Sequence, residues 1–216
     1  MSKIALFGAS GTIGSRVRRE ALDRGHQVTA VVRDPRKITE EHPALTVVTG
    51  DVLDAASVGA VAEGHDVVVS AVGGGDGPGH QATIKPAAEA LVEGLRSLGT
   101  DAPRLIAVGG AGSLRTPDGA QVWDADGLPE FVLQIMHAHG DALDFYRTVG
   151  DIRWTCLSPA AQIEPGERTG RYRTAVDDLI VGADGQSRIS AEDYAVALLD
   201  EIEDPRHVGE RFTVGD

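Results

Sequence analysis

The sequence predicts an α/β fold in which one doubly wound, parallel β-sheet carries helices on both faces. Short apolar runs alternate along the chain with longer stretches of helical periodicity. The runs are mostly Val, Ile, Leu and Ala without polar alternation, which is typical of strands covered on both faces. Because parallel neighbours need crossovers of this length, the repeated strand-helix-strand order indicates a doubly wound sheet. The 216 residues fit a single domain, 1–216, with a small C-terminal extension.

The expected elements follow one another in chain order. Strands are expected at Lys3 to Phe7, Gln27 to Val32, Leu45 to Thr49, Asp66 to Ala71, Arg104 to Val108 and Trp154 to Leu157. Helices are expected at Thr12 to Arg24, Ala55 to Glu63, His80 to Leu98, Pro129 to Thr148 and Ala191 to Ile202. Turn residues among short apolar pieces between Thr169 and Ser190 indicate one or two added strands. We expect residues 158–216 to contribute the substrate-side wall of the domain.

Two stretches interrupt the alternation. Gly73 to His80, "GGGDGPGH", is too rich in glycine for regular structure, and Leu114 to Leu128 is polar, with Pro117 and two glycines. Both follow expected strands. Loops at the carboxyl ends of parallel strands line the ligand crevice of such sheets, so these stretches are candidate pocket walls or lids. An ordinary surface loop is an equal alternative for the second.

Composition excludes several classes of protein. The formal net charge of −13 disfavours binding to the backbone of a nucleic acid or to an anionic membrane surface. The single cysteine, Cys156, allows no disulfide within the chain and is expected to be a buried, inert thiol. No secretory leader pattern or long apolar segment is present, so we expect a cytoplasmic protein. No metal site is expected.

The stretch "GASGTIG", which starts at Gly8, joins the first strand to the first helix. Gly8, Gly11 and Gly14 would allow a sharp turn, a close main-chain approach to a ligand, and tight packing of helix on strand. Free N–H groups at the helix start favour a bound phosphate. The position of this motif predicts dinucleotide binding, with a purely structural turn as the alternative.

The residues after the next two strands bear on which dinucleotide binds. "AVVRDPRK" places Arg33 where proteins that bind NAD tend to carry a carboxylate, and a guanidinium can grip a 2′-phosphate. This favours NADP over NAD, although Asp34 offsets part of the charge and a solvated basic turn is the alternative.

"GDV" follows the third strand, where Asp51 could accept from the adenine amino group and Val52 could pack on the ring. Asp51 could instead cap the next helix, although Asp54 fits that role better.

These motifs resemble those of the atypical short-chain dehydrogenase/reductase group, in the NAD(P)H-binding branch that includes NmrA-like proteins, biliverdin reductase B and flavin reductases. The resemblance rests on "GASGTIG", "VVRDP", "GDV" and "SAVGG", with "PGERTGRYRT" and "ISAEDYAVALLDEIE" near the C-terminus, and it covers essentially the whole chain. It implies a Rossmann fold with NADP lying along the first five strands. It is not specific for a substrate.

The resemblance also implies roles for individual residues. Pyrophosphate contacts are implied in the glycine loop, the 2′-phosphate at Arg33, adenine after the third strand, and the ribose and nicotinamide after the fourth to sixth strands. The implied cofactor residues are Gly8, Ser10, Gly11, Thr12, Ile13, Gly14, Arg33, Asp51, Val52, Ala71, Val72, Gly73, Val108, Gly109, Ser158 and Pro159.

The sequence departs from this group in its catalytic residues. Classical members use Tyr-x-x-x-Lys, in which the lysine lowers the tyrosine pKa so that the hydroxyl can pass on a proton. No lysine follows Lys85, so this dyad is absent. Ile135 and His139 would stand at the two positions if the helix from Pro129 took the same place. His139 could contact the nicotinamide ribose or donate a proton near working pH, or could be a surface histidine. Ser113 could orient the substrate or satisfy local backbone.

The absence of the Tyr-x-x-x-Lys dyad limits the reactions that the protein could catalyse. A reductase needs no tyrosine acid if its acceptor takes hydride directly and obtains its proton from solvent, as flavins, quinones and bilins do. We therefore expect an NADPH-dependent reductase of such a small-molecule electron acceptor, acting as a monomer or homodimer. A non-catalytic NADP sensor of the NmrA-like type is the alternative. A nucleotide-sugar epimerase or dehydratase is disfavoured, because it would need the dyad and a larger C-terminal region.

Several side chains keep two interpretations. Arg168, Arg171 and Arg173 could attract an acidic acceptor, although pairing with the abundant carboxylates is favoured. Ser190 followed by Asp193 indicates a helix cap. The aromatic residues Trp123, Phe131, Phe145 and Tyr146 could line a pocket or fill a core.

Overall fold

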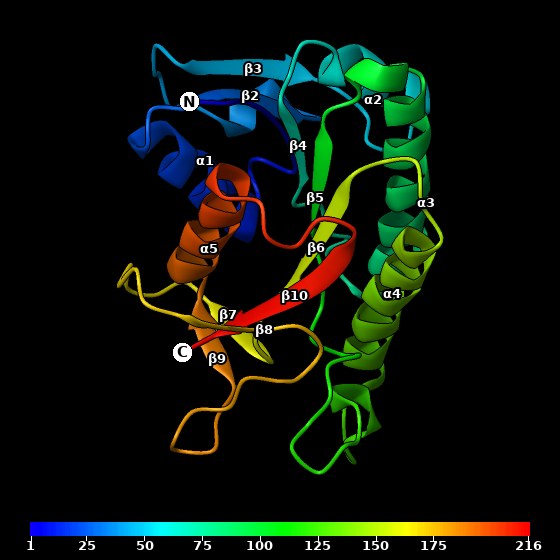
Figure 1. Ribbon diagram of the computed structural model, residues 1–216, viewed down its shortest axis with the longest axis vertical. Helices are drawn as coiled ribbons and strands as arrows, with labels where there is room; N and C mark the ends of the chain where they lie inside the picture. The colour runs from blue at the N-terminus through cyan, green and yellow to red at the C-terminus, as the bar shows by residue number, and fades with distance from the viewer.

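Figure 1 shows the computed structural model of the protein, which describes residues 1–216. Eight strands form one sheet in the order β3-β2-β1-β4-β5-β6-β10-β8. They span Lys3–Phe7 (β1), Gln27–Val32 (β2), Leu45–Thr49 (β3), Val67–Ser70 (β4), Arg104–Val108 (β5), Trp154–Ser158 (β6), Arg173–Ala175 (β8) and Glu210–Gly215 (β10). All neighbours are parallel except β8, which runs antiparallel to β10.

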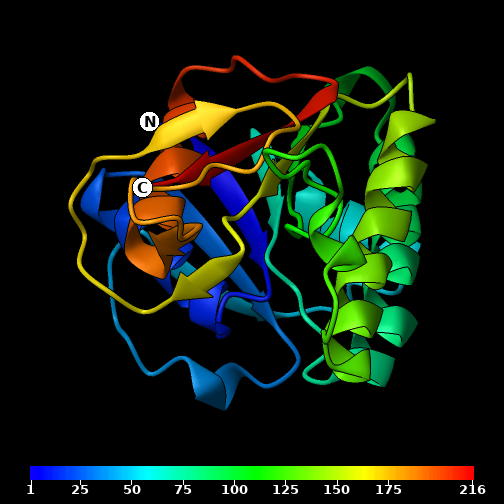
Figure 2. The same ribbon diagram turned by 90° about the horizontal axis from the view of Figure 1, so that it is seen from below.

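Helices cover both faces of the sheet, as Figure 2 shows from below. One face carries α1 (Thr12–Asp23) and α5 (Ala191–Glu203), and the other carries α2 (Ala55–Ala62), α3 (Gly77–Arg96) and α4 (Glu130–Arg147). Each face has its own apolar core, of 24 and 21 buried residues respectively. The two cores are nearly equal, so the sheet is buried on both sides and the predicted doubly wound α/β fold is confirmed.

The expected elements are present, with four of the six strands at the expected bounds. The last strand, β10, was not expected. It lies between β6 and β8, with Arg211 paired to Cys156 across the β6–β10 register. The C-terminal region therefore completes the main sheet and does not merely extend it.

The start of α3 corrects one expectation. Gly77 to His80 were expected to be irregular, but they form the first turn of α3. The Asp76 carboxylate caps this turn by accepting from the Gly79 amide at 2.7 Å, and Pro78 stands at the start of the helix. A carboxylate cap and an early proline both favour helix initiation, and they outweigh the glycines here.

The remaining elements are short. The segment expected to hold one or two strands contains β8 and β9 (Arg188–Ser190), and β9 pairs in parallel with β7 (Gln162–Glu164). The 3-10 helices are η1 (Pro35–Lys37), η2 (Gly99–Asp101) and η3 (Val122–Asp124). None of the helices combines the length and apolar character that crossing a bilayer requires.

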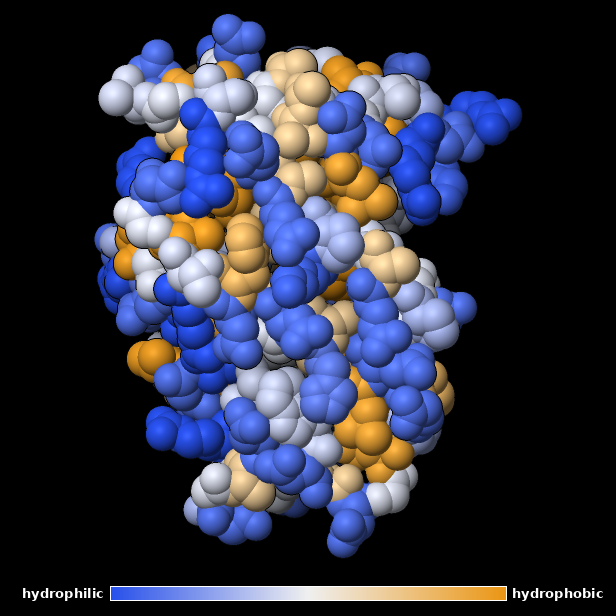
Figure 3. Space-filling model, turned by 90° about the vertical axis from the view of Figure 1, so that its right-hand side faces the viewer, coloured by the Kyte–Doolittle hydropathy of each residue, from blue (hydrophilic) through white to orange (hydrophobic).

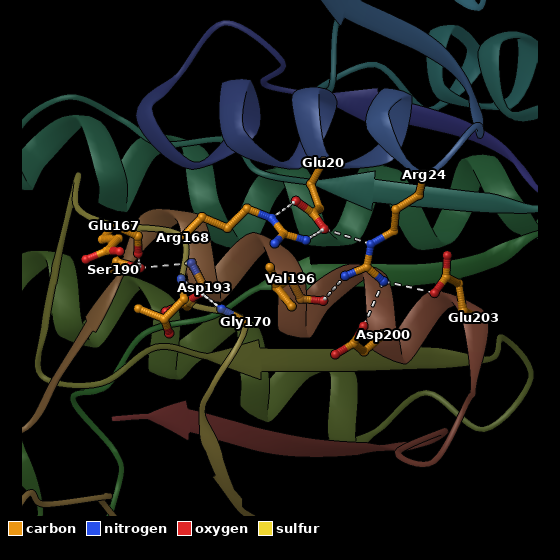
Figure 4. A network of polar contacts seen from close by, with 11 residues as sticks. Glu20, Arg24, Glu167, Arg168, Gly170, Ser190, Asp193, Val196, Asp200 and Glu203 are labelled. Atoms are coloured by element: carbon orange, nitrogen blue, oxygen red, sulfur yellow. Dashed lines mark hydrogen bonds and ion pairs between the residues drawn. The ribbon is translucent and has the colours of Figure 1, made fainter.

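A polar network fastens α1 to α5 and to the loop before β8 (Figure 4). Buried Glu20 accepts from Arg168 at 2.7 and 2.8 Å and from Arg24 at 2.8 Å, and Arg24 reaches Asp200 at 2.7 Å. The Arg168 guanidinium, followed by that of Arg24, lowers the pKa of Glu20 below its ordinary value against the opposing effect of burial. Arg168 is thus paired with a carboxylate, which confirms for this residue the interpretation that the sequence favoured over attraction of an acidic acceptor.

The start of α5 is capped as expected. The Ser190 hydroxyl accepts from the Asp193 amide at 2.9 Å and donates to the Glu167 carbonyl at 2.8 Å. The Asp193 carboxylate in turn accepts from the Gly170 amide at 2.7 Å, as Figure 4 shows. The "ISAED" stretch is therefore a structural cap that also holds the preceding loop.

Candidate functional site

The three glycines after β1 have different structural reasons. Gly8 has a φ of +78°, and a Cβ there would lie 2.4 Å from the Ala71 carbonyl oxygen. A Cβ at Gly14 would lie 2.2 Å from the Gly8 carbonyl oxygen. Both contacts are impossible for a side chain, so Gly8 and Gly14 are required by the fold itself.

Gly11 is different because its surroundings are open. A Cβ there would meet only the Gly8 carbonyl oxygen, at 3.4 Å, and the Ala71 carbonyl oxygen, at 4.0 Å. Gly11 is exposed and stands at the N-cap of α1, where no side chain caps the helix and no acidic residue occupies the first turn. The main chain at the start of α1 is thus free to approach an anionic ligand.

Arg18 holds this loop in place, a role that sequence reasoning missed. Its guanidinium donates to the Ala9 carbonyl at 2.9 Å and pairs with Glu40 at 3.0 Å. Arg18 therefore ties the glycine loop to the connection between β2 and β3. Arg18 and Ala9 are nine residues apart and belong to no common sequence motif, so nothing in the sequence indicated this hydrogen bond.

The tip of β2 leaves one cation free. The Asp34 carboxylate accepts from the Arg36 guanidinium at 2.9 and 3.0 Å and from the Arg36 amide at 3.1 Å. The Arg36 guanidinium holds the pKa of Asp34 below its usual range. Arg33 is exposed and makes no hydrogen bond or ion pair. Because Asp34 is paired with Arg36, the charge of Arg33 is not compensated by its neighbour.

Asp51 and Val52 follow β3 in an exposed turn. The Asp51 Oδ1 accepts from the Leu53 amide at 2.9 Å, and no partner contacts Oδ2. Asp54 caps α2 by accepting from the Ala56 amide at 3.0 Å, as expected. Asp51 is therefore not the helix cap and keeps an oxygen free.

The carboxyl ends of β1, β4, β5 and β6 meet at one edge, because these strands are parallel neighbours. The Ala71 amide donates to the Phe7 carbonyl at 2.9 Å, which places the chain after β4 against the glycine loop. Likewise the Gly109 amide donates to the Leu157 carbonyl at 2.8 Å. The structure thus brings together the predicted residues that follow these strands, namely Gly8, Ser10, Gly11, Ala71, Val72, Gly73, Val108, Gly109, Ser158 and Pro159.

Ser158 at the end of β6 is buried and unpaired. Its exposed fraction is 1%, and its hydroxyl has no hydrogen-bond partner. A Cβ built on Gly109 would lie 3.1 Å from this hydroxyl, so the side chain faces the chain that follows β5. An unsatisfied buried hydroxyl at this edge costs free energy, which a ligand group could recover.

His139 lies on α4 at the rim of a small, mostly apolar pocket that also involves Gly109, Tyr146 and Cys156. A Cβ on Gly110 would lie 2.8 Å from the His139 Cβ, and the His80 ring centre is 5.7 Å away. Burial, helped by His80, lowers the pKa of His139 to about 4. The imidazole is therefore neutral near pH 7. The expectation that it titrates near working pH is wrong, and a hydrogen-bonding role remains open.

The buried aromatic and sulfur groups of this pocket are not acids either. Burial raises the pKa of Tyr146 far above its ordinary value, and the ring stacks on Trp154 in the core. Burial likewise raises the pKa of Cys156 to about 12, which confirms an inert thiol. Phe145 is partly buried against the same core, whereas Phe131 at the start of α4 is 57% exposed.

The stretch Leu114 to Leu128 is fixed to the rest of the protein. The Trp123 ring lies against the ring of His137 on α4, with the centres 4.8 Å apart and the planes tilted by 32°, and Trp123 donates to the Gln121 side chain at 2.9 Å. The Arg115 amide donates to the Asp177 carbonyl at 2.9 Å, in the segment after β8. These contacts hold the stretch as a wall beside the site. Figure 3 shows apolar side chains gathered toward the lower end of this mainly hydrophilic side, where α4 begins.

Comparison with known proteins decides the family. Residues 8–205 match the family described as NAD(P)H-binding, which is most of the chain. The chain belongs to the NAD(P)H-binding family. The uncharacterised protein YwnB of Bacillus subtilis (strain 168) is 39% identical over 215 residues, 98% of this chain and 97% of YwnB. The fold is the Rossmann fold that the motifs implied.

Two solved structures are similar to the chain over nearly its whole length. A candidate epimerase from Bacteroides thetaiotaomicron is 43% identical with a TM-score of 0.90, covering 99% of this chain and 96% of its own. A candidate NADH-flavin reductase from Streptococcus pneumoniae TIGR4 is 30% identical with a TM-score of 0.85, covering 100% of both chains.

The residues at this edge fit the cofactor that the family name specifies. Gly11 leaves the start of α1 open, Arg33 is an unpaired cation at the neighbouring strand tip, and the Ser158 hydroxyl is an unsatisfied polar group at the far end. Open amides at a helix start can bind a pyrophosphate, and a free guanidinium and a buried hydroxyl can donate to further polar groups of a dinucleotide.

Proposed function

We propose that the protein is an NADPH-dependent oxidoreductase that reduces a flavin-like, quinone-like or bilin-like acceptor by direct hydride transfer. The observation that carries this proposal is that the side chains which α4 contributes to the small pocket supply no usable acid. His139 is held neutral, Tyr146 is buried with a raised pKa, and no lysine follows Lys85. An acceptor of this class needs no such acid, because it can take its proton from solvent.

The proposed cofactor residues act along the edge described above. The amides of Thr12, Ile13 and Gly14, with Gly8, Ser10 and Gly11 around them, would bind the pyrophosphate, and Asp51 and Val52 would bind adenine. Ala71, Val72, Gly73, Val108 and Gly109 would line the ribose and nicotinamide, and Ser158 and Pro159 the carboxamide. When bound, the reduced nicotinamide supplies the hydride.

Arg33 supports the choice of NADPH. A guanidinium can bind a phosphate through paired hydrogen bonds, and this one has no protein partner to give up. The name of the S. pneumoniae protein specifies NADH, so the preference for NADPH rests on Arg33 of this chain. That same name supports a flavin-like acceptor.

The acceptor would lie between the fixed loop before α4 and residues 158–216. The start of α4 contributes exposed Phe131, and η3 contributes half-buried Trp123. Apolar side chains of this kind suit a planar ring system. The Ser113 hydroxyl would face the polar part of the acceptor.

A non-catalytic NADP sensor of the NmrA-like type is the second candidate. It is favoured by the same neutral pocket, which offers no group for proton transfer to a substrate. An epimerase, as the B. thetaiotaomicron relative is named, would need an acid and a base of ordinary pKa, and the pocket provides neither.

Turnover measurements distinguish these candidates. The purified protein is mixed with NADPH or NADH and with FMN, menadione or biliverdin, and the absorbance band of the reduced cofactor is followed. We expect NADPH oxidation with at least one acceptor and a lower rate with NADH. Tight NADPH binding without turnover of any acceptor would overturn the reductase and favour the sensor.

A further inference from the structure

A buried arginine, paired with a half-buried carboxylate, reaches the Ser113 hydroxyl from the C-terminal part of the chain. Arg211 on β10 is 4% exposed. Its Nε lies 2.9 Å from the Asp177 Oδ1, its Nη2 contacts the same carboxylate, and its Nη1 lies 2.7 Å from the Ser113 Oγ. Asp177 is also 3.6 Å from Arg147 of α4. One guanidinium therefore joins β10, the segment after β8, and the loop after β5.

The direction of the hydrogen bond to Ser113 is fixed by chemistry. Arginine can only donate, so the Ser113 Oγ accepts. The hydroxyl hydrogen of Ser113 has no acceptor within the protein. No backbone group bonds to this hydroxyl, so the alternative in which it satisfies local backbone is wrong. The hydrogen is left for another group.

The position of Ser113 is fixed as well as its hydroxyl. Its carbonyl accepts from the Gln121 side chain at 3.3 Å. The next residues are bound to the segment after β8, where Leu179 donates to the Arg115 carbonyl at 2.7 Å. Ser113 is half-buried and follows Gly112, which packs on Met136 and Trp123. It therefore stands on a rigid part of the wall beside the proposed acceptor.

We propose that Arg211, anchored by Asp177, is a positioning residue that makes the Ser113 hydroxyl a hydrogen-bond donor to the acceptor. The inference rests on the proposed function. It specifies an acceptor with a carbonyl oxygen or ring nitrogen on which negative charge develops as hydride is added. Ser113 keeps its proton throughout. The proton that the acceptor's oxygen or nitrogen finally takes comes from solvent. The adjacent guanidinium strengthens the donor, since a positive charge stabilises charge build-up on the Ser113 oxygen.

A double-mutant cycle tests the inference. Ser113→Ala removes the hydroxyl. Arg211→Lys keeps a cation opposite Asp177, but a single ammonium group cannot bond to Asp177 and Ser113 in the way that the planar guanidinium does. We expect each substitution to lower kcat for menadione with NADPH by about 10- to 100-fold, with little change in the NADPH dissociation constant. In the Ser113→Ala background, Arg211→Lys should lower kcat no further.

Melting of the cofactor-free variants gives a readout independent of turnover. If the bond exists, Arg211→Lys should lower the melting temperature less in the Ser113→Ala background than alone. Ser113→Thr, which keeps a hydroxyl, should retain most of kcat. The control is Arg115→Ala, which breaks the exposed ion pair to Asp178 on the same loop without touching Ser113 and should leave kcat unchanged. Should Arg211→Lys not fold, Asp177→Asn releases the same guanidinium and takes its place in the cycle.

The outcomes separate the two proposals. If the kcat losses of Ser113→Ala and Arg211→Lys multiply in the double variant, or if their melting shifts add, the role of Arg211 is overturned. The proposed reductase function would still stand in that case. Absence of any wild-type turnover overturns the proposed function, and the inference with it.

Discussion

The two ends of the candidate site use charged groups in opposite ways. At the tips of β2 and β3, Arg33 is exposed and unpaired, and Asp51 keeps an oxygen free. At the ends of β5 and β6, by contrast, Arg211 is buried and fully engaged, and His139 is neutral. At the first end, these free groups can bind a charged or polar group of a ligand. The second end favours neutral, planar chemistry, because burial disfavours the charged forms of the pocket groups His139, Tyr146 and Cys156.

The largest expected effect concerns the glycines that join these ends. Gly14→Ala should destabilise the protein by about 3 kcal/mol or more, since its Cβ would lie 2.2 Å from backbone that cannot move away cheaply. Gly11→Ala should leave the melting temperature nearly unchanged and weaken NADPH binding at least about tenfold by crowding the start of α1. Thermal melting and calorimetric titration of both variants check this. Equal loss of stability in the two would remove the distinction between them.

The next effect tests the free cation at the tip of β2. Arg33→Ala should weaken NADPH binding by about 10- to 100-fold and leave NADH binding unchanged, because only NADPH carries the additional phosphate. Arg36→Ala is the comparison: it removes a cation of the same turn that is already paired with Asp34, so it should weaken NADPH binding less than Arg33→Ala does. Competition binding of the two dinucleotides measures both. An unchanged preference in Arg33→Ala would reject the role of Arg33.

A smaller effect lies outside the site, in the network between α1 and α5. The pKa of Glu20 is lowered in the folded protein, so its contribution to stability is present above the unfolded pKa and is lost as the pH falls through the folded pKa. Glu20→Gln should lower the free energy of unfolding by about 1–3 kcal/mol at pH 7, and the difference should shrink as the pH falls below about 4.5. Denaturant unfolding across this range checks it, and NADPH affinity should not change. A difference that grows on acidification would contradict the account.

The smallest effect is expected at Asp34. Asp34→Ala removes a carboxylate whose charge is already paired with Arg36, so NADPH affinity should change by less than about threefold, toward tighter binding. Titration at low and moderate salt measures this. Marked weakening would mean that Asp34 itself binds the cofactor.

The sequence predicted most of the fold and identified the glycine loop and Arg33, whose role in binding a cofactor stays a prediction. Strands such as β1 are continuous apolar runs, and the glycine spacing and Arg33 are local signals. β10 was missed because buried Arg211 and Thr213 break the apolar pattern, and only the long-range pairing to Asp177 makes Arg211 compatible with burial. The start of α3 was missed because the glycines outweighed the cap at Asp76.

The arrangement of side chains at the ends of β5 and β6 depended on contacts that no short motif encodes. Ser113 and Arg211 are 98 residues apart in sequence, and their bond exists only once β10 enters the sheet. The neutral state of His139 likewise follows from packing against Gly110 and from the nearby His80. Local sequence identified Ser113 and His139, but the hydrogen bonding of the first and the protonation of the second are properties of the tertiary structure.

Calorimetric titration of the wild-type protein with NADPH, and separately with NADH, tests the central claim most directly. If the start of α1 binds pyrophosphate and Arg33 binds the further phosphate, both dinucleotides should bind, with NADPH at least about tenfold tighter. No heat of binding with either dinucleotide at millimolar concentration would contradict the account.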